Sequence, residues 1–219
     1  AGAPAPDGIT GPDGPECASA LLGRTLAAGD PAGGPTGRCP ADTLTPDDAD
    51  ALRDTVNFLA VLGNRNLTLV ADGTPRSAAA ARSVRSAAAA AGIGVATPDR
   101  PSGPLLIVSG WSTADSALRR ATAGGRIPPG GTYLAPWLAT APLLEIRAGA
   151  HIPLRSGLDG ELPGRYRDAL RAGYPGQTPS AAGYRAWLAE QRIAETDPVR
   201  IYQVVNGATI PMSGPLDTP

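Results

Sequence analysis

The middle of the chain contains a pattern that few folds accommodate: an apolar run, a turn, an alanine-rich segment and a second apolar run. Residues 67–70 are typical of a strand buried on both faces of a parallel sheet. Thr74 suits a helix N-cap and Pro75 the first helical position, while Gly92 suits the helix end, before a strand over 93–96. The sequence therefore predicts a β-loop-α-β unit, whose strand-to-helix loop is where open α/β sheets bind ligands.

The same alternation continues on both sides of this unit. Thr45, Pro46 and two aspartates predict the start of a helix that ends at Gly63. Asn206-Gly207 suits a tight turn between two terminal strands. Further elements are predicted as helices over 17–28, 113–123, 162–172 and 180–191 and strands over 105–108, 132–134 and 150–154. The predicted fold class is α/β: a mostly parallel doubly wound sheet with flanking helices and a C-terminal antiparallel hairpin.

The composition excludes several classes of partner. With 219 residues, 42% of them hydrophobic, the chain can bury a substantial core. Its net charge of −1 provides no field that would attract nucleic acid or anionic lipid. No run approaches the ~20 apolar residues that a membrane span needs. All 19 basic residues are arginine, which is typical of a GC-rich genome and indicates no function.

Cys17 and Cys39 are the only cysteines, and both lie in a segment rich in glycine and proline. In an exported protein they would form one disulfide, which contributes about 3 kcal/mol for a loop of this size. In a cytosolic protein they would be two buried thiols. We favour the disulfide, and the opening Ala-Gly-Ala-Pro-Ala-Pro is typical of a mature chain from which a signal or anchor was removed. An extracellular or cell-surface location is therefore expected.

Four stretches carry a resemblance to a known family. They are a helix and strand over 47–72, a long helix leading through Ala-Gly into a strand over 77–95, the helix pair over 166–184 with its Gly-Tyr-Pro-Gly turn, and the ribbon over 202–207. Their order resembles the second, C-terminal lobe of type I periplasmic binding proteins, in the branched-chain amino-acid receptor branch. The likeness covers about three quarters of the chain.

This resemblance implies a single binding-protein-like lobe over 45–219, preceded by a Pro/Gly-rich extension over 1–44 that the Cys17–Cys39 disulfide would staple. The family binds its ligand between two lobes, and residues 1–44 are too few to form the first one. The loop over 74–77 also departs from the family, which usually offers an aromatic residue and a glycine there. The resemblance implies a lobe whose ligand cleft is incomplete.

The carboxyl ends of the predicted parallel strands should meet at one edge of the sheet. We expect two exposed indoles there, beside hydroxyls and an arginine that could hold a small amphipathic molecule. The alternative is that both indoles pack against the N-terminal segment and that the hydroxyls only cap helices. The candidate ligand-binding residues are Thr74, Arg76, Ser109, Trp111, Ser112, Tyr133 and Trp137, with Asp72 beside them.

A serine hydrolase is the enzymatic alternative. Gly110-Trp111-Ser112-Thr113-Ala114 follows a strand and opens a helix, close to the Gly-x-Ser-x-Gly nucleophile elbow. His151, the single histidine, would be the base, with Glu145 or Asp159 orienting it. The final glycine of the motif is alanine, however, and Ser112 with Asp115 also makes an ordinary capping pair.

Metal and cofactor chemistry is not expected. Two cysteines and one distant histidine do not make a zinc site, and the glycines lack the spacing of a phosphate-binding loop. The first hypothesis is therefore an exported, non-catalytic domain that recognises a small amphipathic molecule or a protein partner. The second is a protein-interaction module, with a homodimer among the expected forms, whose strand-end face is covered by another subunit or by residues 1–44. The hydrolase is the third.

Overall fold

The computed structural model describes residues 14–29, 42–123, 128–146, 149–205 and 208–216. They form one seven-stranded sheet in the order β2-β1-β3-β4-β5-β6-β7. Five neighbouring strands are parallel, and β6 and β7 continue the sheet in antiparallel pairing. The strands are β1 (Asn66–Val70), β2 (Gly94–Ala96), β3 (Leu105–Ile107), β4 (Thr132–Leu134), β5 (His151–Leu154), β6 (Arg200–Val205) and β7 (Ala208–Pro211). The predicted fold class is confirmed.

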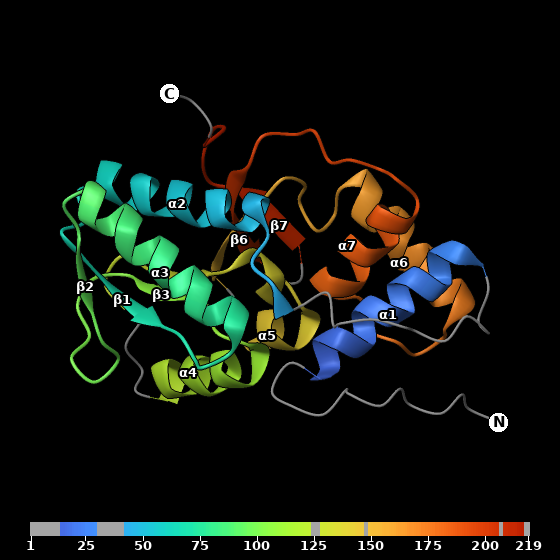
Figure 1. Ribbon diagram of the computed structural model, residues 1–219, viewed down its shortest axis with the longest axis horizontal. Helices are drawn as coiled ribbons and strands as arrows, with labels where there is room; N and C mark the ends of the chain where they lie inside the picture. The colour runs from blue at the N-terminus through green and yellow to red at the C-terminus, as the bar shows by residue number, and fades with distance from the viewer. Residues whose placement is uncertain (1–13, 30–41, 124–127, 147–148, 206–207, 217–219) are drawn as a thin grey trace.

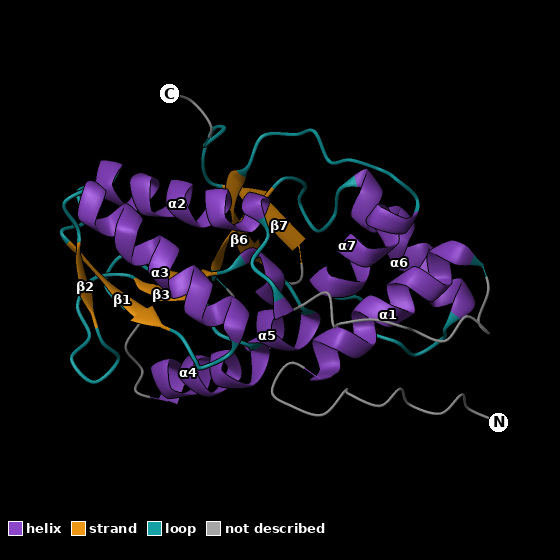
Figure 2. Ribbon diagram, in the orientation of Figure 1, coloured by secondary structure: helices purple, strands orange, loops and turns teal. Residues whose placement is uncertain are grey.

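Helices follow or precede most of the strands and cover both faces of the sheet (Figures 1 and 2). They are α1 (Gly14–Ala28), α2 (Pro46–Val61), α3 (Pro75–Ala90), α4 (Trp111–Ala123), α5 (Ala141–Ile146), α6 (Glu161–Gly173) and α7 (Ala181–Glu190), with a short 3-10 helix η2 (Pro136–Leu138). Because parallel crossovers are right-handed, and the chain moves in opposite directions along the sheet after β1 and after β3, α3 and α4 lie on opposite faces.

The two predicted helix starts differ in how they are capped. At α2, Thr45 Oγ1 accepts a hydrogen bond from the amide of Asp48 at 3.2 Å, as predicted for an N-cap with proline after it. At α3, Thr74 occupies the N-cap position, but its side chain makes no cap bond. Its hydroxyl instead donates a hydrogen bond to Asp72 Oδ1 at 2.6 Å. The predicted capping role of the Thr74 side chain is therefore wrong.

The core has two parts. The larger one fills the space on both sides of the sheet and includes the strand residues Leu67, Leu106 and Ile152. The smaller one lies among α1, α6 and α7, which gather at one end of the molecule (Figure 1), and is centred on Tyr166 and Trp187. We call α1, α6 and α7 the helical cluster. It is the part of the fold that the sheet pattern alone did not predict.

Within the helical cluster, α1 lies directly on α7. A side chain added at Gly23 would come within 2.1 Å of the carbonyl oxygen of Gly183, so the two backbones touch where both residues are glycine. The predicted domain boundary at residue 44 separates α1 from the lobe in the sequence, whereas in space α1 packs against it. Cys17 is buried on α1. Cys39 lies outside the described residues, so the Cys17–Cys39 disulfide stays a prediction.

Smaller differences from the predicted elements concern boundaries. Helix α4 begins at Trp111, two residues earlier than predicted, because the carbonyl of Gly110 already accepts a helical bond from Ala114. The segment around residue 143, which the pattern did not assign, is the helix α5. No helix in the described part of the chain combines the length and the apolar character that a membrane crossing requires.

Candidate functional site

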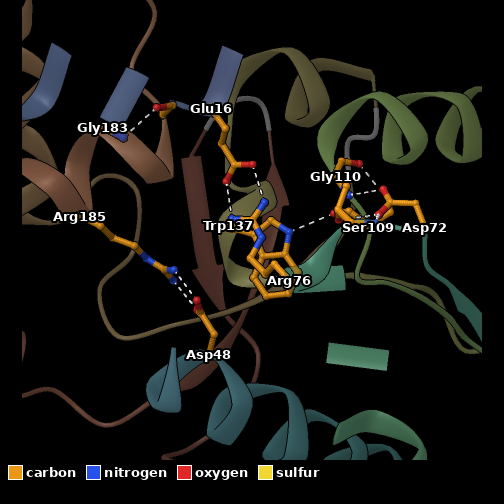
Figure 3. Close-up of polar contacts among 11 residues, drawn as sticks. Glu16, Asp48, Asp72, Arg76, Ser109, Gly110, Trp137, Gly183 and Arg185 are labelled. Atoms are coloured by element: carbon orange, nitrogen blue, oxygen red, sulfur yellow. Dashed lines mark hydrogen bonds and ion pairs between the residues drawn. The ribbon is translucent and has the colours of Figure 1, made fainter. Parts of the chain in front are cut away.

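The carboxyl ends of β1 and β3, where ligand binding was predicted, are tied together by Asp72. Its carboxylate accepts hydrogen bonds from the Thr74 amide at 3.0 Å and from the Thr74 hydroxyl at 2.6 Å. It also accepts one from the Gly110 amide at 2.7 Å (Figure 3). Partial burial alone would raise the pKa of Asp72, but these donors outweigh it, and the pKa lies below its ordinary value. The loops after β1 and β3 are therefore held to each other by an ionised, internally satisfied carboxylate.

Arg76 lies in the first turn of α3 and is buried. Its two terminal nitrogens bind the two carboxylate oxygens of Glu16, with Nη1 at 2.8 Å from Oε1. The side chains of Arg76 and Glu16 are only 5% and 2% exposed. The guanidinium also lies over the ring of Trp137, 4.6 Å from its centroid (Figure 3). The first turn of α1, which carries Glu16, thus covers this edge of the sheet.

Trp137 is buried in the same place, with 1% of its surface exposed. Its Nε1 donates to the carbonyl oxygen of Ser109 at 3.0 Å, and Ser109 is itself buried. The predicted exposed indole at Trp137 is therefore wrong: the ring forms the surface on which Arg76 rests. Tyr133 is buried too, and its ring stacks on His151 with centroids 4.8 Å apart.

Three of the predicted ligand-binding residues keep some exposed surface. Thr74 and Trp111 are half-buried, and Ser112 is exposed at the start of α4. Trp111 Nε1 makes no hydrogen bond to any of the residues that the structure describes. We call the region of Asp72, Arg76, Ser109 and Trp137 the closed edge, because Glu16 covers it and its polar groups bind one another.

The structure does not assemble a hydrolase site around Ser112 and His151. Ser112 follows the carboxyl end of β3, whereas the imidazole of His151 lies beside Gly131, which precedes the amino end of β4. Burial lowers the pKa of His151 although a backbone hydrogen bond with Thr132 acts in the opposite direction, and its Nδ1 has no hydrogen-bond partner within the described ranges. Asp159 instead accepts a hydrogen bond from Thr209 at 2.8 Å. Glu145 lies on α5, exposed.

A pocket of about 870 Å³ lies farther along the same edge of the sheet, and we call it the helix–sheet pocket. One wall comes from the start of α2 and the segments after β4 and β5, and the other from α6, α7 and the segment that follows α7. Most of its lining is apolar, with Leu144, Leu154, Leu158, Leu188, Ile193 and Val199 among its residues. A volume of this size is in the range of small-molecule sites.

One ion pair lines this pocket and, like the pair at the closed edge, joins a guanidinium and a carboxylate through two hydrogen bonds. Arg185 of α7 binds both carboxylate oxygens of Asp48 of α2, each at 2.7 Å (Figure 3). Burial alone would lower the pKa of Arg185, but the Asp48 carboxylate more than compensates and raises it. The Asp48 side chain is 3% exposed and that of Arg185 is 38% exposed. Both residues line the pocket, and the arginine is the more accessible member of the pair.

Two tyrosines and another arginine add polar groups to the pocket. The Tyr184 hydroxyl donates to Glu195 at 2.9 Å, and burial together with that carboxylate raises the pKa of Tyr184 well above its usual range. Burial raises the pKa of Tyr166 to about 12, so both rings are neutral at physiological pH. Arg155 donates to the carbonyl oxygen of Asp197 at 2.8 Å, and its other terminal nitrogen lies 3.9 Å from Asp47.

Sequence reasoning missed this pocket for an identifiable reason. The aspartates at the start of α2 were interpreted as partners of the helix dipole, and Arg185 is one of the 19 arginines of the chain, on the helix predicted over 180–191. Asp48 and Arg185 are 137 positions apart, and no local pattern marks a contact over that distance. The only signal available was the resemblance over the 166–184 helix pair, which indicated that these helices belong to the fold but not where they dock.

No protein-family model and no curated protein matches the chain. Solved structures do match. A solute-binding protein of an ABC transporter from R. palustris, in complex with benzoate, aligns with a TM-score of 0.57 and 11% identity over 76% of this chain. A branched-chain amino-acid ABC transporter protein from Thermus thermophilus with bound valine aligns with a TM-score of 0.57 and 12% identity over 80%. A possible leucine/isoleucine/valine-binding protein from Rhodopirellula baltica SH 1 gives 0.58 and 10% over 76%.

These matches establish the fold. Over about three quarters of its length the chain has the architecture of type I periplasmic binding proteins of the branched-chain amino-acid receptor group, as the resemblance predicted. The chain spans 62% of the R. palustris protein, 66% of the Thermus thermophilus protein and 64% of the Rhodopirellula baltica protein.

Among the described residues, no group of three or more His, Cys, Asp or Glu side chains could hold a metal ion.

Proposed function

We propose that the chain is a non-catalytic, exported binding domain that holds a small amphipathic molecule in the helix–sheet pocket. The observation that carries this proposal is the pocket itself: about 870 Å³ between two parts of the fold, with apolar walls and a few polar groups. Apolar lining supplies affinity through burial, and a few placed polar groups fix orientation. At the closed edge, by contrast, the described side chains of Glu16, Arg76 and Trp137 are buried against one another.

The polar groups of the pocket match the amphipathic class. The Arg185 and Arg155 side chains are 38% and 27% exposed, so each retains surface for a ligand oxygen. Leu154 and Leu158, which are half-buried, supply apolar surface in the same lining. The structural neighbours support the same class, because one was solved with benzoate and another with valine, each a carboxylate with an apolar part.

A substitution on α7 tests the location of the site. Ala189 is exposed, lines the pocket and lies on the helix face that meets it. We expect Ala189→Trp to fill the pocket mouth and weaken binding at least tenfold, while the free energy of unfolding changes little, because the position is open to solvent. Thermal-shift screening of small aromatic and branched aliphatic acids would supply the probe, and isothermal titration would measure its dissociation constant.

The matched control is Ala89→Trp, which places the same ring on an exposed position of α3 that does not line the pocket. It should bind the probe as the unsubstituted protein does. Equal affinity of Ala189→Trp and Ala89→Trp for a probe that stabilises the protein would contradict the proposed site.

One observation favours the second hypothesis, a protein-interaction module. The strand-end edge is covered by α1, which lies in the N-terminal segment, as that hypothesis anticipated. Val61 and Leu62 at the end of α2 are also 85% and 57% exposed, which leaves apolar surface for a partner. Absence of any stabilising small molecule, together with a dimer by light scattering, would favour this module over the binding domain.

A further inference from the structure

The contact between α1 and the closed edge has the geometry of a bound ligand. The Glu16 carboxylate approaches from a separate helix, 60 positions earlier in the chain, and meets the guanidinium of Arg76 through two parallel hydrogen bonds. This paired geometry is the one by which arginine recognises free carboxylates. Both side chains are at most 5% exposed, so water does not screen the interaction.

The receiving side of this contact is fixed independently of Glu16. The ring of Trp137 lies under the guanidinium, and its Nε1 is held by the Ser109 carbonyl oxygen at 3.0 Å. Ser109 follows β3 and Trp137 follows β4, so two strand ends position the surface on which Arg76 rests. Asp72 in turn joins the loops after β1 and β3 through its bond to the Gly110 amide. The arginine is therefore pre-positioned, as in a binding site, by groups that would remain if Glu16 were truncated.

We propose that the closed edge is a carboxylate-binding site that the chain's own Glu16 occupies, and that truncating this side chain creates a site for the smallest monocarboxylates, formate and acetate. The unsubstituted protein then binds no free carboxylate at this edge, because the tethered carboxylate is present at a high effective concentration. This inference concerns a region distinct from the helix–sheet pocket and does not rest on the function proposed for that pocket.

The test is rescue of Glu16→Ala by free carboxylates. Removing the side chain beyond Cβ takes away a CH2–COO⁻ group and so leaves room for a formate or acetate ion next to Arg76. The melting temperature of Glu16→Ala should rise saturably with formate and acetate, by roughly 5–10 °C at about 100 times the dissociation constant. Sodium chloride at equal ionic strength and acetamide, which has the shape of acetate without its charge, should not reproduce the rise.

Two variants identify the site of the effect. Glu16→Gln keeps the space filled by an amide of the same shape. Acetate should therefore change its melting temperature no more than chloride does at equal ionic strength. The double variant Glu16→Ala with Arg76→Leu lacks the guanidinium and should show no rescue. A rise of equal size in the unsubstituted protein, in Glu16→Gln or in the double variant would overturn the proposal, as would a Glu16→Ala protein that responds only to ionic strength.

If Glu16→Ala does not fold in chloride, the same proposal is tested by refolding. The yield of folded protein, measured by near-ultraviolet circular dichroism, should recover in formate or acetate and not in acetamide. No recovery in either carboxylate would overturn the proposal. These outcomes are independent of the pocket, because the Ala189→Trp substitution should leave the carboxylate rescue unchanged.

Discussion

The closed edge and the helix–sheet pocket lie along the same edge of one sheet, and each contains an arginine that binds a carboxylate through two hydrogen bonds. At the closed edge, Arg76 and Glu16 are both shielded from solvent, with side chains 5% and 2% exposed. At the pocket, Asp48 is equally shielded, but 38% of the Arg185 side chain is exposed. The two regions therefore use the same chemistry with opposite access to solvent.

The difference between them comes from where α1 lies. Its first turn brings Glu16 onto Arg76, whereas the rest of α1 packs on α7 and leaves the space between α7 and β5 open. A strand-end edge is a general place for ligands in open α/β sheets. In this chain the edge is open only where α1 does not cover it, and the covered part contains a buried ion pair.

The largest expected effect is the loss of stability on truncating Glu16. Breaking a buried pair leaves a desolvated charge, so we expect Glu16→Ala to lower the free energy of unfolding by about 3–5 kcal/mol. We expect Asp48→Ala to cost less, roughly 1–3 kcal/mol, because Arg185 can reach water in the pocket. Urea unfolding of the two variants measures the difference. Equal losses would show that the two pairs do not differ in access to solvent as described.

The next effect concerns the docking of α1. A methyl group at Gly23 would lie 2.1 Å from the carbonyl oxygen of Gly183, so α1 and α7 must separate in Gly23→Ala. We expect a loss of about 1–3 kcal/mol in the free energy of unfolding. The control is Gly73→Ala in the loop after β1, where a methyl group would meet nothing within 4 Å. Equal free energies of unfolding for Gly23→Ala and Gly73→Ala would contradict the close packing of α1 on α7.

A smaller change in the free energy of unfolding should appear at acid pH, and it should originate in the closed edge. The pKa of Asp72 lies below its ordinary value of 3.8 in the folded chain, so the unfolded chain takes up this proton first. The stability that Asp72 contributes is therefore present above about pH 4 and is lost as the pH falls below it. Urea unfolding at pH 7 and pH 3.5 measures how much the free energy of unfolding decreases in acid, which we call the acid loss. The acid loss should be smaller in Asp72→Asn than in the unsubstituted protein.

Thr74→Val provides the graded comparison for this pH dependence. It removes the 2.6 Å hydroxyl bond to Asp72 and keeps the amide bonds from Thr74 and Gly110. Its acid loss should lie between those of the unsubstituted protein and Asp72→Asn. An acid loss in Asp72→Asn that equals that of the unsubstituted protein would show that Asp72 does not link the loops as an ionised group.

The sequence predicts most of the fold because its signals are local. Continuous apolar runs mark the parallel strands, and Thr45-Pro46 and Thr74-Pro75 mark the starts of α2 and α3. The resemblance to binding proteins rests on the order of these elements, which the solved structures reproduce. The site was harder to predict, because it depends on where α1 and α7 dock. Glu16 with Arg76 and Asp48 with Arg185 are separated by 60 and 137 positions.

The same limit explains why Trp137 was assigned to an exposed ligand surface. Its position after a strand end was predicted correctly, but exposure depends on whether another element covers that end. The sequence contained both possibilities, an open indole and an indole packed against the N-terminal segment. Only the placement of α1 decides between them, with Glu16 on Arg76 and Arg76 on Trp137.

The most direct test of the account follows the indole N–H signals by ¹⁵N–¹H NMR while a stabilising small molecule is titrated into the protein. Of the three tryptophans, Trp187 packs on Tyr166 of the pocket wall, with ring centroids 5.8 Å apart, whereas Trp111 lies beside the closed edge. The Trp187 signal should shift with the binding isotherm, and the Trp111 signal should stay in place. A shift of Trp111 with no change at Trp187 would contradict this prediction and would assign ligand binding to the strand ends that α1 covers.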